Sequence, residues 1–326
     1  MGFDASPYRG QRVLVTGASG FIGRWVARAL AQAGAEAWLA GRDPAALEAV
    51  CRRYSFAGTP CIADLARPGE FKRLWNEARP AVTFNLAGYG IDREEKDDAL
   101  AGQLNTGLVR EILEALETAA STAWAGLRLV HAGSAFEYGA VPGTINEDTP
   151  ATPVATYGRT KLAATELVSA AAGRGLRAAA ARLFTVYGPG EHPNRLLPSL
   201  MRAAETGETL PMTGGRQQRD FTYVEEVAEG MLRLGLQPEP VGTVHLATGR
   251  LTSIREFALA AAELLSLREG QLQLGALPYR TDETQQGPTD VTKLKKLVFW
   301  KPSLTVREGI EKTIEFERAA RARHSI

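Results

Sequence analysis

A tyrosine and a lysine four residues apart, Tyr157 and Lys161, are the pair whose types and spacing best suit catalysis. On a helix, residues at this spacing lie on one face, one turn apart. A tyrosine hydroxyl titrates near pH 10, and a nearby ammonium group would favour its ionised form and lower its pKa. Tyr157 would then act as a general acid or base, with Lys161 adjusting its pKa. The alternative is an exposed pair on an amphipathic helix, because this spacing is common by chance.

Ser134 is a third residue suited to chemistry, and topology rather than a motif places it. It follows a predicted strand at residues 127–132, and ligands of open α/β sheets bind beyond the carboxyl ends of the strands. Its hydroxyl could hydrogen-bond a reacting carbonyl or alcohol beside Tyr157. The alternative is a turn hydroxyl bonded to nearby backbone. Glu137 and Tyr138 stay open between a functional role and packing.

A glycine-rich turn near the start of the chain suits a dinucleotide. A predicted strand at residues 12–16 leads into GASGFIG, residues 17–23, and then into a predicted helix at 24–33. Gly17 would allow the tight turn, Gly20 the approach of a pyrophosphate, and Gly23 the packing of helix on strand. The spacing differs from the GxGxxG of ordinary dinucleotide folds, and the alternative is a structural turn without ligand.

The end of the second predicted strand, residues 36–40, bears on which dinucleotide binds. NAD-binding folds usually place an acidic residue here against the ribose 2′-hydroxyl. In this chain Gly41 leaves room for a 2′-phosphate and Arg42 can pair with it, so the sequence favours NADP(H). NAD(H) is the alternative, with Arg42 solvated and Asp43 taking the acidic role.

Strands and helices alternate along the first two thirds of the chain, which predicts a parallel α/β sheet with right-handed crossovers. Further strands are expected at residues 61–65, 81–87 and 176–184, and helices at 98–120, near 253–265 and at 306–320. Asp64 could bond the adenine amino group. Small residues around Ala87 leave space for a cofactor, or simply end a buried strand.

Arginines in loops or at element ends are the remaining binding candidates, because two or three could converge on a diphosphate by bidentate pairing. They are Arg195, Arg216, Arg219 and Arg280. The alternative for each is a surface charge.

Composition excludes several classes of function. The chain has 326 residues, 44% of them apolar, with a net charge of +1, so no basic field attracts nucleic acid. Cys51 and Cys61 suit a reducing compartment, and neither CxxC nor Cys/His metal spacing occurs, so no metal site is expected. No apolar run approaches the roughly 18 residues that span a membrane. The expectation is a cytoplasmic protein without membrane contact.

Over nearly its whole length, the chain resembles the extended short-chain dehydrogenase/reductase family. The resemblance rests on an ordered set of motifs: segment 16–23, segment 85–87, Ser134, Tyr157 with Lys161, and segment 187–190. Within that family, segments 182–190, 219–224 and 279–280 are similar to enzymes acting on nucleotide-diphosphate sugars. The resemblance implies a Rossmann-type doubly wound parallel sheet with a smaller α/β substrate lobe. Residues 1–188 would form the dinucleotide-binding domain, to which the chain returns at about 221–248, and residues 189–220 and 249–326 the substrate lobe.

The same resemblance implies roles for individual residues and a homodimer formed by two central helices. Ser134, Tyr157 and Lys161 would be the catalytic triad. Besides Tyr157 and Lys161, the residues that would contact the dinucleotide are Gly17, Ser19, Gly20, Phe21, Ile22, Gly23, Arg42, Asp64, Leu65 and Ala87. Those that would bind the sugar nucleotide are Ser134, Arg195, Arg219 and Arg280.

Departures from the family pattern narrow the expected reaction. Dehydratases carry Thr-Asp-Glu where this chain has Ser134-Ala135-Phe136, so the acid and base for removing water are missing. Many members have Phe-Asn where this chain has Phe-Thr, residues 184–185, which puts one phosphate or cofactor contact in doubt. The chain is more similar to GDP-4-keto-6-deoxymannose reductases in three places: the Gly-Arg pair at 41–42 and the segments 133–134 and 137–139.

The leading expectation is therefore NADPH-dependent reduction of the 4-keto group of a nucleotide-diphosphate deoxysugar, with Tyr157 as proton donor. A 4-epimerase with tightly held NAD(P) is the alternative, and a noncatalytic NADP-binding family member a minor one. The intact residues Ser134, Tyr157 and Lys161 count against the last.

Overall fold

The computed structural model describes residues 3–92, 94–120, 122–279 and 286–324. Within these residues, seven parallel strands form the main sheet in the order β3-β2-β1-β4-β5-β6-β11. The strands are β1 (Arg12–Thr16), β2 (Glu36–Gly41), β3 (Thr59–Ile62), β4 (Val82–Asn85), β5 (Leu129–Ser134), β6 (Ala178–Leu183) and β11 (Gly242–Leu246).

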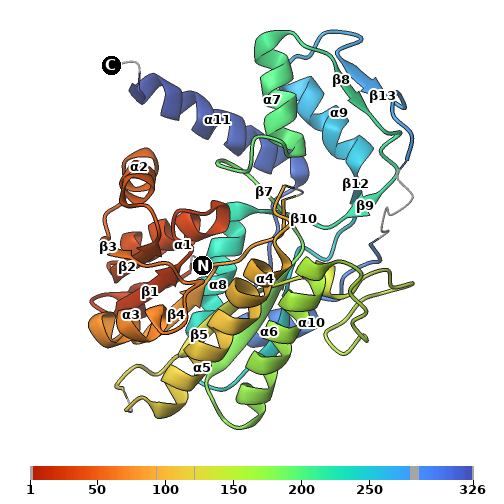
Figure 1. Cartoon of the computed structure of the whole chain (residues 1–326). Coiled ribbons are helices and arrows are strands. Elements are labelled where there is room, and N and C mark those ends of the chain that lie inside the picture. The colour runs from red at the N-terminus through yellow and green to blue at the C-terminus, as the bar shows by residue number, and fades with distance from the viewer. Residues whose placement is uncertain (1–2, 93, 121, 280–285, 325–326) are drawn as a thin grey trace.

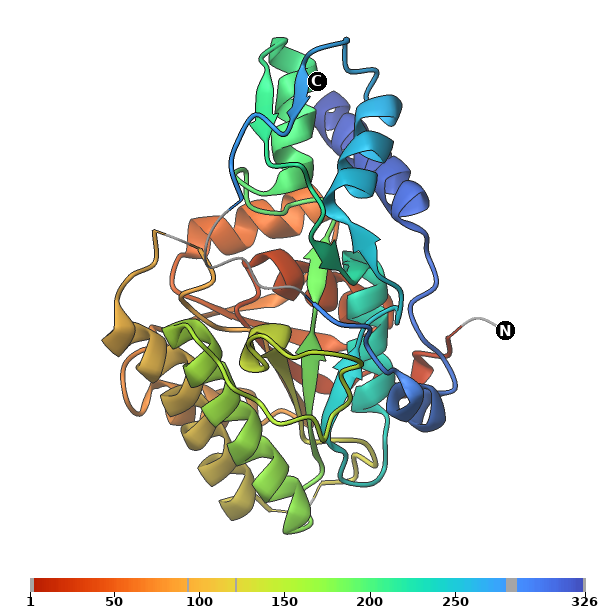
Figure 2. The same cartoon turned by 90° about the vertical axis from the view of Figure 1, so that its right-hand side faces the viewer.

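Both faces of this sheet are covered by helices, because neighbouring residues of each strand point to opposite sides. Val13 and Val15 pack in one hydrophobic cluster, whereas Leu14 packs in the other. Figure 2 shows the sheet between the two helical layers. One layer holds α1 (Phe21–Gln32), α2 (Pro44–Tyr54), α8 (Val224–Gly235) and α10 (Thr292–Val298), and the other α3 (Glu70–Ala78), α5 (Leu108–Thr118) and α6 (Thr156–Gly173). The predicted doubly wound α/β fold is confirmed.

A smaller group of elements lies above the carboxyl edge of the sheet, at the top of Figure 1. Its core contains Tyr187, Phe221 and Phe257, and the rings of Phe221 and Phe257 stack with centroids 4.4 Å apart. Its helices are α7 (Leu196–Thr206), α9 (Ile254–Leu264) and α11 (Val306–His324). Its strands pair as β7 (Thr185–Tyr187) with β10 (Phe221–Tyr223), β8 (Leu210–Met212) with β13 (Leu272–Leu274), and β9 (Gln218–Arg219) with β12 (Thr252–Ser253).

Buried carboxylates hold the chain where it passes between these two groups of elements. Asp220, fully buried, accepts hydrogen bonds from the Thr248 amide at 2.9 Å, the Thr248 hydroxyl at 2.8 Å and the Gly249 amide at 2.8 Å. Glu226 on α8 accepts from the amide of Ser303 at 2.6 Å. Because a buried carboxylate without partners is costly, these bonds fix the paths of the two crossing segments.

Several element boundaries differ from those predicted. β3 ends at Ile62 and not at residue 65, so Asp64 lies in the following turn, and β5 extends to Ser134, which therefore ends a strand. The helix expected at 98–120 is α4 (Asp98–Ala101), a π-helical turn η2 (Gly102–Gly107) and α5. In that turn, Asn105 donates to Tyr89 O at 2.8 Å and to Thr160 Oγ1 at 2.9 Å, so tertiary bonds accompany the interruption.

The hydrophobic clusters place α10 on the main sheet, although it lies within residues 249–326. Leu294 and Val298 of α10 belong to the cluster that also contains Val244 of β11. The described residues include no helix long and apolar enough to cross a membrane. In the same ranges, no group of three or more His, Cys, Asp or Glu side chains is arranged to hold a metal ion.

Replacing Gly23 by alanine should destabilise the fold, because an added Cβ would lie 2.1 Å from the carbonyl oxygen of Gly17. Backbone shifts that relieve such overpacking cost about 1–3 kcal/mol. Gly173→Ala is the matched control, since a Cβ at this exposed position of α6 meets nothing within 4 Å. The midpoint of denaturant unfolding should fall for Gly23→Ala and stay the same or rise for Gly173→Ala. Equal midpoints would contradict the packing role of Gly23.

Candidate active site

Ser134 is held at the carboxyl end of β5 by a reciprocal capping arrangement. Its side chain caps the short 3-10 helix η3 (Ala135–Glu137), accepting from the Phe136 amide at 3.2 Å. In return, the Ser134 amide donates to Glu137 Oε1 at 2.7 Å. The hydroxyl of Ser134 also hydrogen-bonds Tyr157, so two of the predicted catalytic residues meet.

Tyr157 and Lys161 lie in the first turns of α6, one turn apart. Tyr157 is half-buried, and the ring of Phe136 meets it edge-on with centroids 5.9 Å apart. Lys161 is 4% exposed and donates from Nζ to the carbonyl oxygen of Ala132 on β5. The helix therefore brings both side chains to the end of the strand that carries Ser134.

Burial shifts the pKa values of this pair in opposite directions, because it disfavours every charged form. It raises the pKa of Tyr157 to about 12, against a lowering by the Ser134 hydrogen bond, while the charge of Glu137 raises it further. It lowers the pKa of Lys161 to about 8, against the charge of Glu137. The expected net lowering of the Tyr157 pKa is wrong for this structure, because burial outweighs the lowering contributions. Lys161 Nζ here bonds the carbonyl oxygen of Ala132. Tyr157 is a protonated hydroxyl at neutral pH.

A cavity of about 280 Å³ opens beside Tyr157. It is lined by Tyr157 and its neighbour Thr156, by Gly90 and Asp92, and by the segment 95–98 that leads into α4. Arg195, at the start of α7, reaches its edge, with Nη2 3.3 Å from Asp92 Oδ1. A larger cavity, about 320 Å³, lies between α1 and α8 and does not include Tyr157. Of these two cavities, the one lined by Tyr157 is the candidate substrate cavity.

The glycine turn forms an open cradle at the start of α1. Gly17 has a φ of +66°, and a Cβ there would lie 2.8 Å from the backbone of Leu86 and Ala87. Gly20 is the N-cap, and no side chain caps the helix. Arg24 bonds the carbonyls of Ser19 and Gly20, which adds positive charge beside the helix N-terminus. Uncapped helix N-termini bind anions, so this turn fits the pyrophosphate of a dinucleotide.

The other predicted cofactor residues lie at or near the carboxyl edge of the sheet or in α1. Phe21 and Ile22 are half-buried in the first turn of α1, and Leu65 is buried after β3. The amide of Ala87 donates to Thr16 Oγ1 at 3.3 Å. Asp64 pairs with Arg67 at 3.2 Å and is not buried.

The residues expected to select the dinucleotide follow β2. Arg42 is exposed, whereas Asp43 is the N-cap of α2 and accepts from the Ala45 amide at 2.9 Å. The carboxylate that was the alternative partner for the ribose is therefore engaged in capping its own helix. This leaves the Arg42 guanidinium as the charged group adjoining Gly41.

The predicted phosphate-binding arginines have different surroundings. The charge of Arg195 lowers the pKa of Tyr157, so Arg195 lies near the Tyr157 hydroxyl. Arg219 lies on β9, half-buried, with Nη1 2.8 Å from Gln218 O. Arg216 is exposed. Arg280 lies outside the described residues.

The sequence analysis missed Glu191, which follows the Gly-Pro-Gly turn at 188–190. Burial raises the pKa of its carboxyl to about 8, against the charge of Arg195. Its Oε2 is buried without a hydrogen-bond partner among the described residues. The acidic residue directly after a glycine-rich strand exit was the available signal. Asp92 and Glu95, which line the cavity, were also missed, and the only signal for them was their position in a charged segment.

The chain is similar to known proteins over most of its length. A model of the NAD dependent epimerase/dehydratase family matches residues 13–245. A dTDP-6-deoxy-L-talose 4-dehydrogenase (NAD(P)(+)) from Kitasatospora kifunensis is 32% identical over 316 residues, covering 92% of this chain and 93% of the relative. The structure of MoeE5 in complex with UDP-glucose and NAD aligns with a TM-score of 0.78 at 29% identity, covering 94% of this chain and 99% of MoeE5. The epimerase Mth375 of Methanothermobacter thermautotrophicus has a TM-score of 0.82 at 23% identity, covering 98% and 96%, a likeness of fold alone.

Arg42→Ala should erase most of a preference for NADP over NAD. Charge-assisted hydrogen bonds contribute about 1.5–3 kcal/mol each, so one or two from Arg42 to a 2′-phosphate favour NADP by about ten- to several hundred-fold. Gly41→Asp should turn the preference toward NAD by repelling the phosphate. Calorimetric titration of both cofactors into the wild type and each variant measures this.

Gly41→Asp needs a fold control, because a Cβ at this position would lie 3.3 Å from three side-chain carbons of Leu47. Its unfolding midpoint should therefore be measured beside that of Arg42→Ala. Tighter binding of NAD than of NADP by the wild type would contradict the assignment of Arg42.

Proposed function

The chain belongs to the NAD-dependent epimerase/dehydratase family as an enzyme of the extended short-chain dehydrogenase/reductase type, and we propose that it uses NADPH to reduce the 4-keto group of a nucleotide-diphosphate deoxysugar. The relative from Kitasatospora kifunensis is named a 4-dehydrogenase of dTDP-6-deoxy-L-talose. A 4-dehydrogenase and a 4-ketoreductase catalyse one reaction in opposite directions. MoeE5, in complex with UDP-glucose, supports the substrate class.

The observation that carries the proposal is the protonated Tyr157 hydroxyl, which is hydrogen-bonded to Ser134. The two residues that follow Ser134 in the sequence carry no carboxylate. Reduction of a ketone needs one proton donor at the carbonyl oxygen, and Tyr157 supplies it. Elimination of water needs a further acid and base, and the corresponding positions here are Ala135 and Phe136. The side chains of this site therefore favour hydride transfer alone over dehydration.

In the proposed reaction, the hydroxyls of Ser134 and Tyr157 hydrogen-bond the keto oxygen. These bonds orient the oxygen toward the Tyr157 proton that it will receive. The dinucleotide, when bound at the α1 cradle, supplies hydride to C4 of the sugar. Tyr157 gives its proton to the oxygen as the new C–H bond forms, so the ketone becomes an alcohol. The Lys161 ammonium, one turn along α6, stabilises the phenolate that Tyr157 becomes.

Each part of the chain has a proposed task. Residues 1–188 and 221–248 bind the dinucleotide, and residues 189–220 and 249–326 the sugar nucleotide, with Arg195 and Arg219 on its phosphates. NADP(H) is the preferred cofactor, since Asp43 caps α2 beside the exposed Arg42. We also expect a homodimer paired through the two central helices, α5 and α6.

A 4-epimerase is the second candidate, because the family model is named for epimerases and MoeE5 is in complex with NAD. Incubating the enzyme with a panel of nucleotide 4-keto sugars and following NADPH oxidation tests the reductase. Isomerisation of a nucleotide sugar without added NADPH, together with copurified oxidised cofactor, would instead support the epimerase.

Tyr157→Phe should lower kcat by about 10² or more, since general acid catalysis contributes about that much. The variant loses one hydroxyl, and its ring packing against Phe136 is retained. NADPH oxidation with the substrate found in the panel gives kcat, and a thermal melt shows whether the fold is intact. Wild-type kcat in a folded Tyr157→Phe enzyme would exclude Tyr157 as the proton donor.

The reductase should also lose kcat/KM as the pH rises through about 8, where Lys161 loses the proton that makes it cationic. Glu191 titrates in the same range, so Glu191→Gln is the control. The decline should persist in that variant. If it disappears, Glu191 and not Lys161 is the titrating group.

A further inference from the structure

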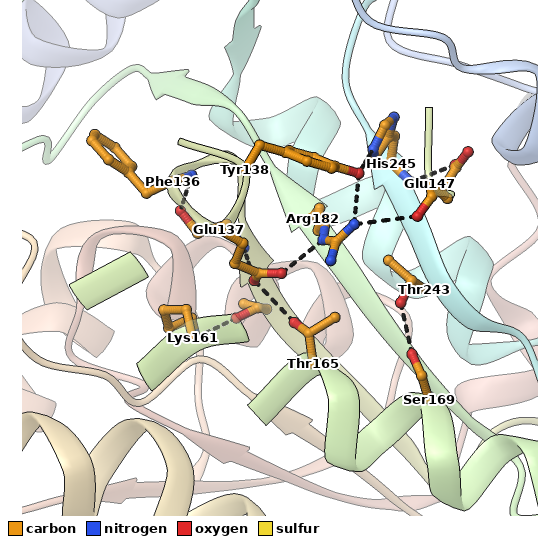
Figure 3. A network of polar contacts seen from close by, with 12 residues as sticks. Phe136, Glu137, Tyr138, Glu147, Lys161, Thr165, Ser169, Arg182, Thr243 and His245 are labelled. Atoms are coloured by element: carbon orange, nitrogen blue, oxygen red, sulfur yellow. Dashed lines mark hydrogen bonds and ion pairs between the residues drawn. The ribbon is translucent and has the colours of Figure 1, made fainter. Parts of the chain in front are cut away.

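Glu137 is fully buried behind Ser134, and three groups on different elements bond its carboxylate (Figure 3). The Ser134 amide donates to Oε1 at 2.7 Å and the Thr165 hydroxyl of α6 at 2.9 Å. Arg182 of β6 donates from Nε to Oε2 at 2.7 Å. A buried ion pair with this many partners is rigid, because any movement would leave a charge unpaired.

Arg182 is in turn held from its other side. Its Nη1 donates to the Tyr138 hydroxyl at 2.6 Å, and its guanidinium lies 4.4 Å from the centre of the Tyr138 ring. The Tyr138 hydroxyl lies 2.5 Å from His245 Nε2 on β11 (Figure 3), and His245 Nδ1 lies 2.9 Å from Asp290 O. The ion pair is thus tied to β5, β6, β11 and α6 together.

Gly133 leaves the space that this arrangement occupies. A Cβ at Gly133 would lie 3.0 Å from both Glu137 Oε1 and Thr165 Oγ1. Any larger residue before Ser134 would therefore press on the carboxylate. The glycine, the serine and the glutamate form one local unit at the end of β5.

We propose that Glu137 is a positioning residue: its carboxylate, held by Arg182 and Thr165, fixes Ser134 in place at the end of β5. The inference rests on the proposed function for the reaction whose rate is measured. Ser134 and Tyr157 touch the keto oxygen in that reaction, whereas Glu137 acts through Ser134 and Lys161.

The charge on Glu137 has an effect on Lys161 that packing would not have. Among the described residues, the titratable groups near Lys161 include Tyr157 one turn away on its own helix, His131 on β5 and Glu137 on η3. Burial and the charge of Lys161 hold the pKa of His131 well below its usual range, so His131 is neutral. Glu137 is the group whose charge raises the pKa of Lys161. Its removal should lower that pKa.

Three variants separate position from charge. Glu137→Gln keeps the shape and removes the charge, but leaves Arg182 buried and unpaired. The double variant Glu137→Gln with Arg182→Met removes both charges and avoids this penalty. Glu137→Asp keeps the charge on a shorter side chain. Ser169→Ala is the matched control, since it removes a 2.7 Å contact with Thr243 between α6 and β11, away from Glu137 (Figure 3).

The wild type is first measured on the nucleotide 4-keto sugars, and failure there contradicts the proposed function and not this inference. With an active wild type, the single and double glutamine variants should lose at least about 10-fold in kcat, as displaced catalytic groups do, with KM for NADPH unchanged. Their decline of kcat/KM should move to lower pH. Glu137→Asp should lose kcat and keep the wild-type pH profile, and Ser169→Ala should match the wild type in both.

A folded double variant with wild-type kcat and an unmoved pH profile would overturn the inference. If the two glutamine variants do not fold, Glu137→Asp decides, and wild-type kcat in that variant would overturn the positioning role.

Discussion

The parallel alignment of the strands is the constraint on which the site depends. Parallel neighbours end at one edge, so residues far apart in the sequence come together there. Polar side chains join three strands near that edge: Thr16 Oγ1 donates to Asn85 Oδ1 at 2.6 Å, and Asn85 Nδ2 lies 3.0 Å from His131 Nδ1. All three are fully buried. These bonds across β1, β4 and β5 stabilise the edge that carries the glycine turn and Ser134.

Burial determines the chemistry available at that edge. The same loss of water raises the pKa of Tyr157 and lowers that of Lys161, because each charged form is disfavoured. Tyr157 is therefore protonated and able to donate its proton, and Lys161 loses its proton at a lower pH than an exposed lysine does. Glu137 is paired with Arg182 in the same interior. One buried ion pair thus lies beside two groups whose protonation matters to the reaction.

The fold alone does not select among the reactions of the family. Epimerases, dehydratases and dehydrogenases are all among the relatives of this chain. In this chain Ala135 and Phe136 supply no acid or base next to Ser134, and Phe136 is 56% exposed beside Tyr157. The lack of an acid or base on these two residues supports the proposed reduction over dehydration.

The sequence by itself determined the features that depend on neighbouring residues: the alternating strands and helices, the glycine turn before α1, and the tyrosine and lysine on one helix face. Helices α2, α3, α7, α8 and α10 were not predicted from the sequence, nor was the correct end of β5. Only the tertiary structure decided that Asp43 caps α2, that Lys161 bonds Ala132, and that Glu137 pairs with Arg182, 45 residues away. The reason is that burial and long-range pairing depend on every element packed around a side chain, and a local pattern of residues carries no information about those elements.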